Sequence, residues 1–387
     1  MNTKTAEPHV LLTYRAMIPS VRWFAYEQLR VLDGQGRLSL RAREEKTLRA
    51  QDIAWADWVV LCRADTGFED WLSKHCYALG RKLIYLLDDD LQNVPQGLSS
   101  STYYRDPFVQ RTRERILGRC DALLTPSPQL AAQYDAGLPL TLMVEQPAMN
   151  RPGWRPRKDQ RVHIGFCGSA DRAADVESVL GGMLPKLMEK YGGRISVEFF
   201  GAQPPVAKKL GLPCYPYTAN AEAYYAQMAS LGWDIGLAPL PESPFYQCKY
   251  YNKFVEYASY GIAGVYSALP PYRDVVRDGV DGLLCGNTPD AWLDSLTRLI
   301  EDDGLRQRMG QAAAARAEAF APQCVAERLW ERMSSLHAFR AEPGRLSSLR
   351  LALAKAIYGV QLGWQTIRRH GVRLVPLLWR RLKGVGR

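Results

Sequence analysis

KYYNKFVEYASYGIAGVYSALPPYRDVVRDGVDGL, residues 249–283, is the stretch that decides the fold of this chain. It reads as a basic and aromatic turn, an amphipathic helix, an apolar strand over 262–267, a short second helix and a double-glycine turn. Gly261 suits a helix end, because glycine adopts the left-handed backbone conformation without steric cost. A helix joined by a tight turn to a buried strand is the repeating unit of a parallel α/β sheet.

The charged residues of this stretch predict an anion site. Lys249 and Lys253 lie four residues apart, so a helix that begins near Tyr250 projects both amines from one side of its first turn. The unpaired backbone N–H groups there add positive charge, which favours a diphosphate. Glu256, one turn past Lys253, is placed to accept hydrogen bonds from a vicinal diol such as a ribose. The alternative is an ordinary αβ unit with a solvated Lys/Glu face.

The run N-K-F-x-E-Y-x-x-x-G-I-x-G-V-x-S, followed by D-G-x-D-G-L-L, resembles the donor-nucleotide segment of group 1 glycosyltransferases of the GT-B fold. The resemblance is specific over residues 162–284 and architectural over the N-terminal half. It implies two Rossmann-like domains with a cleft between them. It also implies a nucleotide-diphosphate sugar as donor and retention of anomeric configuration without a protein base.

Site residues follow from this resemblance, position by position. A lysine or arginine of the family holds the donor diphosphate, and a glutamate in the helix binds the ribose. The resemblance therefore implies Lys249 and Lys253 as the catalytic cations, and Glu256, Asn252, Arg172, Gly168 and Ser169 as donor-binding residues. The family usually carries a second glutamate eight residues upstream, where this chain has Cys248, so the group that contacts the transferred sugar is not identified.

Three consecutive carboxylates, Asp88, Asp89 and Asp90, follow the apolar run Leu83–Leu87. The C-terminal end of a parallel strand is the working edge of a sheet. We expect the triplet to line the cleft on the acceptor side. Two alternatives stay open: a turn decorated with acids, and a metal site of the kind that the D-x-D of single-domain GT-A glycosyltransferases provides. The GT-A alternative leaves the strand and helix alternation of residues 160–300 unexplained.

Length and composition favour a two-domain α/β enzyme. The chain has 387 residues, of which 47% are hydrophobic and 23% charged, and this length exceeds what one core usually holds. A linker is indicated by the three prolines of residues 146–160. The predicted limits are a Rossmann-like acceptor domain over 1–150, a Rossmann-like donor domain over 160–320, a crossover helix over 321–339 and a basic amphipathic tail over 340–387.

The net charge of +10 resides in that tail. Residues 340–387 hold eleven Lys and Arg against one acid, Glu342, whereas residues 1–339 hold equal numbers of both signs. Apolar residues at spacings of three and four and two tryptophans accompany the charge, which favours a surface anchor on anionic lipid. Glycines at 359, 363 and 371 and Pro376 predict several short helices. The alternatives are helices packed back on the body and, least favoured, nucleic-acid binding.

Export and membrane-spanning functions find no support in the sequence. The eight cysteines form no C-x-x-C pair, no 18-residue uncharged apolar stretch occurs, and the first residues lack a signal-peptide pattern. We therefore expect a cytoplasmic protein that is peripheral on the inner face of the membrane, with no nucleic-acid partner and no cofactor or required metal.

These inferences combine into one expected function. The chain is expected to be a glycosyltransferase of hexosyltransferase type that moves a sugar from a nucleotide-diphosphate sugar to a polysaccharide, glycolipid or other glycoconjugate at the cytoplasmic membrane face. A nucleotide-sugar epimerase of the same fold and a non-catalytic GT-B-like scaffold are the alternatives. None of the five histidines is identified as a catalytic base.

Overall fold

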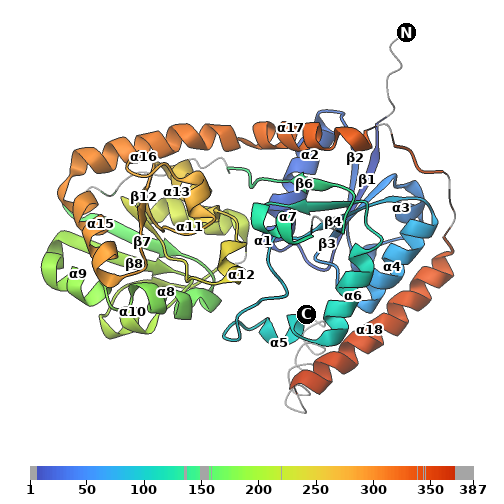
Figure 1. Ribbon diagram of the computed structural model, residues 1–387, viewed down its shortest axis with the longest axis horizontal. Helices are drawn as coiled ribbons and strands as arrows, with labels where there is room; N and C mark the ends of the chain where they lie inside the picture. The colour runs from blue at the N-terminus through green and yellow to red at the C-terminus, as the bar shows by residue number, and fades with distance from the viewer. Residues whose placement is uncertain are drawn as a thin grey trace, which may run out of the picture.

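The computed structural model describes residues 7–134, 137–148, 157, 159–218, 220–337, 339–342, 344 and 346–370, with side chains to residue 361. Two parallel sheets lie side by side, each covered by helices on both faces (Figure 1). The fold predicted from the sequence, two Rossmann-like domains, is confirmed.

The first sheet has the order β2-β1-β3-β4-β5-β6, and all of its strands are parallel. Its strands are β1 (His9–Tyr14), β2 (Ser39–Glu44), β3 (Trp58–Cys62), β4 (Lys82–Leu86), β5 (Ala122–Thr125) and β6 (Thr141–Met143). Around it lie α1 (Pro19–Val21), the π-helical segment Arg22–Tyr26, α2 (Glu27–Gly34), α3 (Ala50–Trp55), α4 (Gly67–Ala78), α5 (Ser101–Tyr104), α6 (Pro107–Leu117) and α7 (Pro128–Tyr134). Strands β3 and β5, each with a neighbouring strand on both sides, are buried throughout, as apolar parallel strands require.

The second sheet has the order β12-β11-β10-β7-β8-β9 and is also parallel. Its strands are β7 (Val162–Cys167), β8 (Ile195–Phe200), β9 (Cys214–Tyr215), β10 (Ile235–Ala238), β11 (Ala263–Ser267) and β12 (Leu283–Cys285). Its helices are α8 (Ala173–Leu180), α9 (Leu184–Tyr191), α10 (Pro205–Lys209), α11 (Ala221–Leu231), α12 (Pro244–Gln247), α13 (Asn252–Tyr260), α14 (Tyr272–Val275), α15 (Pro289–Glu301) and α16 (Asp303–Ala317).

Each sheet has a point at which the strand order reverses. In the first sheet the chain moves from β1 outward to β2 and then to β3 on the other side, and in the second it reverses between β7 and β10. Ligands of open α/β sheets bind beyond the carboxyl ends of the strands at these switch points. The topology therefore indicates two sites, one beyond β1 and β3 and one beyond β7 and β10.

Helices α15 and α16 carry the chain back toward the first domain. They are two helices and not one, because Asp302 caps a new helix at residue 303 by accepting a hydrogen bond from the Leu305 amide at 2.8 Å. Helix α17 (Pro322–Arg332) then packs on α2 and β6 of the first domain (Figure 1). An apolar cluster crosses between the domains, with the rings of Phe24 and Tyr250 in edge contact at 5.3 Å.

The last described helix, α18 (Ser348–His370), follows the outside of the first domain beside α4 (Figure 1). The expectation of several short helices is wrong as far as residue 370, because the helix continues through Gly359 and Gly363. Leu351 and Ala354 are buried on its inner face, and the Tyr358 ring covers Gly67, where a Cβ would lie 2.6 Å from a ring carbon. The part of the tail beyond residue 370 lies outside the described residues.

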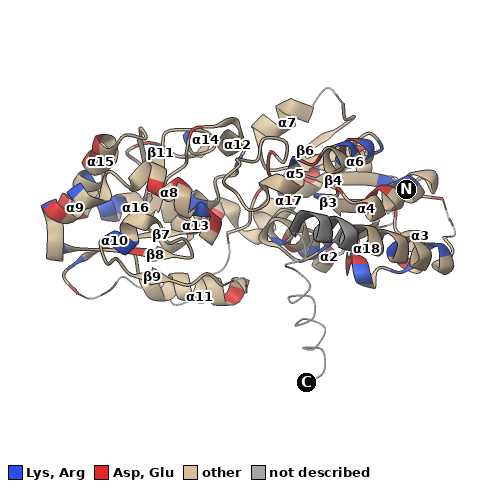
Figure 2. Ribbon diagram, turned by 90° about the horizontal axis from the view of Figure 1, so that it is seen from below, with Lys and Arg blue, Asp and Glu red and all other residues tan. Residues whose placement is uncertain are grey.

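Within the described part of the chain, no helix is long and apolar enough to cross a bilayer. Lys and Arg are interspersed with Asp and Glu over both domains, as Figure 2 shows.

Candidate functional site

Helix α13 places the central carboxylate of the site. Its apolar residues Phe254 and Tyr257 are buried against the sheet, and Gly261 ends the helix in the left-handed conformation at φ 68°. Glu256 lies between these buried positions and is only 2% exposed. A charge at such a position is costly unless it is paired, so its neighbours decide what it can do.

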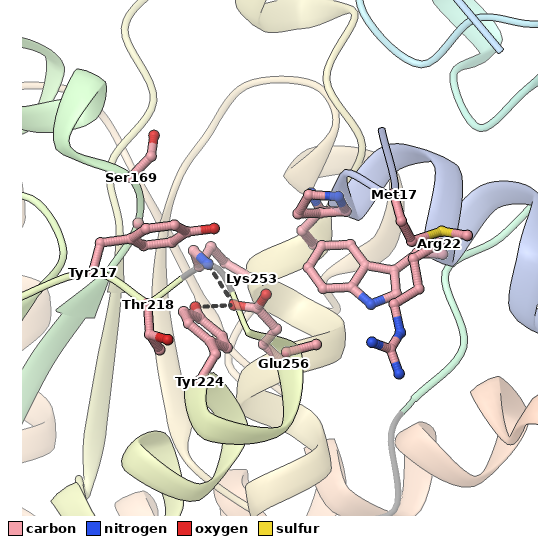
Figure 3. Close-up of a pocket in the computed structure, with 13 residues that line it drawn as sticks. Met17, Arg22, Ser169, Tyr217, Thr218, Tyr224, Lys253 and Glu256 are labelled. Carbon is pink, nitrogen blue, oxygen red and sulfur yellow. Dashed lines mark hydrogen bonds and ion pairs between the residues drawn. The ribbon is translucent and has the colours of Figure 1, made fainter. Parts of the chain in front are cut away.

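Lys253 and Glu256 form an ion pair one helical turn apart (Figure 3). The Glu256 Oε2 atom also accepts from the Tyr224 hydroxyl at 3.5 Å and from the Cys167 thiol at 3.6 Å. Burial would lower the pKa of Lys253, but the Cys167 sulfur and the Glu256 carboxylate override it and raise that pKa. The lysine therefore stays charged, and the pair offers both a cation and an acceptor to a ligand.

This pair opens into a cavity of about 250 Å³ between the two domains. Its second-domain wall carries polar groups, and its first-domain wall is made by the loop after β1 and the π-helical segment (Figure 3). The residues of the second-domain wall are Gly168, Ser169, Tyr217, Thr218, Ala221, Tyr224, Asn252, Lys253 and Glu256, and those of the first-domain wall are Met17, Pro19, Arg22 and Trp23. A concave site with a few convergent polar groups is typical of small-molecule binding.

Gly168 and Ser169 follow β7 directly, at the switch point of the second sheet. A Cβ on Gly168 would lie 2.8 Å from the Phe166 ring, and Gly201, at φ 93°, would place a Cβ 2.0 Å from the Gly168 carbonyl oxygen. These close approaches require glycine at both positions. The turn thus brings bare backbone to the cavity, as a bound phosphate needs.

The remaining predicted donor residues lie in two different settings. Asn252 lines the cavity, and its Oδ1 atom has no hydrogen-bond partner among the described residues. Arg172 is not one of the lining residues. Its guanidinium donates to the Pro239 carbonyl at 3.1 Å, lies 3.1 Å from Asp175 and stacks over Tyr246. Arg172 therefore supports the walls of the site in this conformation.

Lys249 lies outside the cavity. The helix begins at Asn252, two residues later than the sequence analysis requires, so the two lysines do not share its first turn. Lys249 Nζ lies over the Phe245 ring and donates to Asp89 Oδ1 of the first domain at 2.6 Å. The structure thus joins two predicted site residues across the domain boundary, in an interdomain ion pair.

The acidic triplet is engaged by protein groups. Arg63, a non-glycine residue at φ 49°, donates to Asp88 at 2.5 Å and to Asp89 at 2.7 Å. Asp90 is fully buried and accepts from the side chain of Asn93 at 2.7 Å. Burial would raise the pKa of Asp89, but Lys249 and Arg63 override it and lower that pKa. No group of three or more His, Cys, Asp and Glu suited to a metal ion occurs in the described ranges.

Cys248 occupies the position of the missing upstream acid and is turned away from the cavity. It is 2% exposed, packs with the core of the first domain and accepts from the Gln133 side-chain amide at 3.4 Å. A contact with the transferred sugar from this position is therefore absent in this conformation.

Sequence reasoning missed the aromatic residues of the cavity. Tyr217, 42% exposed, follows β9, and Trp23 comes from the π-helical segment of the other domain. Short π-helical segments are frequent at functional sites. No pattern in the sequence indicates the π-helical segment. Tyr217 lies in the stretch PCYPYT, residues 213–218, whose prolines indicate a turn.

Comparison with known proteins agrees with this geometry. Residues 253–316 match the family model described as Glycosyl transferases group 1. A search of curated proteins finds no significant match.

Among solved structures, Anabaena HepE in complex with UDP and glucose aligns with a TM-score of 0.59 at 15% identity, over 85% of this chain and 100% of that one. Sucrose-phosphate synthase from Thermosynechococcus elongatus aligns with a TM-score of 0.62 at 12% identity, over 86% and 100%. A Listeria monocytogenes protein described as a UDP-N-acetylglucosamine 2-epimerase aligns with a TM-score of 0.52 at 11% identity, over 88% and 100%.

The predicted resemblance is confirmed: the chain has the GT-B fold, and residues 253–316 of its donor-side domain match the group 1 glycosyl transferase family model.

Proposed function

We propose that this protein transfers a sugar from a nucleoside-diphosphate sugar, with UDP as the nucleotide, to a hydroxyl group of a glycoconjugate. The observation that carries the proposal is the buried Lys253–Glu256 pair, which opens into the interdomain cavity beside the bare backbone of Gly168 and Ser169. The similar HepE structures hold UDP, glucose and UDP-glucose, which supports UDP over other nucleotides.

Each group of the site has a part in this reaction. Glu256 accepts hydrogen bonds from the ribose diol, and Lys253 with the turn at Gly168 holds the diphosphate. In the transfer, the bond from C1 of the sugar to the diphosphate oxygen breaks and a bond from C1 to the acceptor oxygen forms. The acceptor hydroxyl gives its proton to the diphosphate oxygen, and the diphosphate leaves with the electron pair of the broken bond. Lys253 stabilises the charge that develops on this leaving group.

The test is release of UDP from UDP-glucose by the purified full chain in the presence of an added glycan or glycolipid. Glu256→Gln is the site variant, and Glu222→Gln, exposed on α11, is the matched control. We expect the site variant to lower kcat/KM at least about thirtyfold, because a hydrogen-bonded charged group contributes about 2 to 3 kcal/mol. Equal activity of the site variant and the control contradicts the proposal.

Epimerisation of a nucleotide sugar is the second candidate function, and the similarity to the Listeria monocytogenes protein favours it. An epimerase acts on the nucleotide sugar without an acceptor, so the two functions differ in one observation. Turnover that requires an added glycan or glycolipid supports transfer, whereas change of the sugar in a sample that holds only the nucleotide sugar supports epimerisation. A scaffold binds neither and turns over nothing.

We propose further that α18 holds the protein on the cytoplasmic face of an anionic membrane. Four large apolar side chains lie on its outward side, with exposed fractions between 53% and 77%: Leu349, Leu353, Ile357 and Val360. Eleven Lys and Arg of residues 340–387 supply the attraction to anionic lipid. The inner face of α18 packs on the first domain. One helix can therefore both pack on the protein and contact the membrane with its outer face.

Vesicle partitioning tests the membrane contact. The double variant Leu353→Glu/Ile357→Glu is expected to bind vesicles of phosphatidylglycerol and phosphatidylcholine at least about tenfold more weakly, because it places two charges in the apolar boundary. Val280→Glu, at an equally exposed apolar residue of the second domain, is the control. Undiminished binding of the double variant contradicts the anchor.

A further inference from the structure

Two cavities of the first domain that lie outside the donor site share a lining residue, Arg15. The first, of about 340 Å³, lies beyond the carboxyl ends of β1 and β3, at the switch point of the first sheet. Its walls are mainly apolar and aromatic and include Ile18, Val21, Tyr103 and Tyr104. Because switch points are where α/β sheets bind ligands, this cavity is placed for a second substrate.

One loop separates this cavity from the donor cavity. Residues of the segment after β1 line the two sides in alternation: Met17 and Pro19 line the donor cavity, whereas Ala16 and Ile18 line the cavity of the first domain. A ligand in the second cavity therefore lies beside the donor cavity. Met17 and Ile18 are 39% and 38% exposed, which leaves apolar surface between the two.

The next cavity, of about 410 Å³, leads away from the donor site to α18. Arg15 lines both this cavity and the one at the switch point, so the two adjoin at its side chain. The far wall is formed by Phe68 of α4 and by Tyr358 and Gly359 of α18. Burial, with the neighbouring Glu69 carboxylate, raises the pKa of Glu45 in this wall above its ordinary range.

Buried groups hold Arg15 at the junction. Its guanidinium lies 3.1 Å from Asp65, donates to the Tyr103 hydroxyl at 3.2 Å and donates to the Arg63 carbonyl at 3.2 Å. Because Asp65 is fully buried behind it, the Arg15 side chain is fixed at the boundary between the two cavities. The line of cavities thus runs from the donor site to the helix whose outer side is apolar.

We propose that the acceptor is a glycolipid, whose sugar occupies the switch-point cavity and whose apolar chain passes Arg15 and leaves between α4 and α18 toward the membrane. The proposal rests on the proposed transferase function and narrows its acceptor class. Helix α18 then does two things: its outer side contacts the bilayer, and its inner side forms one wall of the passage for the chain.

Alkyl glucosides of different chain length test this passage. Calorimetry of the full chain saturated with UDP is expected to show decyl β-glucoside, below its micelle concentration, binding at least tenfold more tightly than methyl β-glucoside, because several methylene groups become buried. The preference should fall to less than threefold in Gly359→Phe, which fills the passage; no atom lies within 4 Å of a Cβ built at this position. Gly359→Ala, which removes the same glycine without filling the space, should keep it.

A second blocking variant and a second control make the test decisive. Ser100→Phe narrows the switch-point cavity at a side chain that makes no capping hydrogen bond, and it should also abolish the preference. Leu353→Glu/Ile357→Glu, which alters only the outer side of α18, should keep it. Equal binding of both glucosides to the wild type, or a preference that survives both blocking variants, overturns the glycolipid passage. Failure to bind UDP would instead overturn the proposed function.

Discussion

The two domains share an architecture and differ in what their switch points hold. The second-domain site is polar, with a buried ion pair and bare backbone, whereas the first-domain cavity is apolar and aromatic and its charges are paired within the protein. A nucleoside diphosphate needs fixed cations and acceptors, which only the second-domain cavity offers unshielded by apolar walls. One fold used twice thus provides two chemically opposite sites.

The largest expected effect is on UDP binding, and it distinguishes Lys253 from Lys249. Lys253→Gln should weaken UDP binding about a hundredfold, because a charge-assisted contact to the diphosphate is lost, whereas Lys249→Gln should change it less than threefold, because Lys249 binds Asp89 outside the cavity. Calorimetric dissociation constants measure both, and thermal unfolding checks that each variant is folded. A large loss in Lys249→Gln would show that the interdomain pair rearranges to hold the donor.

The interdomain ion pair predicts a smaller effect on stability. Lys249 and Asp89 are 25% and 18% exposed, so their coupling is only partly screened. A double-mutant cycle with Lys249→Met and Asp89→Asn, measured by urea unfolding, should give a coupling of about 1 to 2 kcal/mol. The lowered pKa of Asp89 means that this contribution is present above the unfolded pKa and is lost as the pH falls through the folded value. Additive single-variant effects contradict the coupling.

A pH effect in the first domain is the third prediction. Burial raises the pKa of Asp65 from an ordinary 3.8 to about 6, against the opposing effect of Arg15. The folded state therefore holds this proton more tightly, and the contribution to stability present below pH 4 is lost as the pH rises through about 6, at most about 3 kcal/mol.

The check on Asp65 is a comparison of urea midpoints at pH 4.5 and pH 7 in the wild type and in Asp65→Asn. The variant keeps an oxygen for Tyr103 and Arg15 but does not titrate. Its midpoint should fall less than that of the wild type between the two pH values. Parallel behaviour of the two proteins would contradict the raised pKa.

Much of the fold could be predicted because its signals are local. The helix and strand of residues 252–267 were readable from apolar spacing and Gly261, and the central strands from short apolar runs. The edge strands β2 and β6 were missed: β2 carries Arg41 and Arg43 in alternation with Leu40 and Ala42, and β6 has three residues.

The donor site could be predicted only in part, because only some of its residues are neighbours in the sequence. Lys253 and Glu256 are neighbours on one helix, so sequence spacing brings them together. The position of Lys249 depends on where α13 begins, which the preceding short helix α12 and its cap at Ser243 help to set. The first-domain cavity joins residues near 15–21, 62–63 and 100–104, and no local pattern reports such an assembly.

The most direct test of the account is calorimetric titration of the full chain with UDP, GDP and TDP, with and without magnesium, beside Glu256→Gln. The account predicts selective binding of UDP that is indifferent to the metal and weakened at least about thirtyfold in the variant. Binding that requires magnesium and is unchanged in Glu256→Gln would contradict the donor site at Lys253 and Glu256.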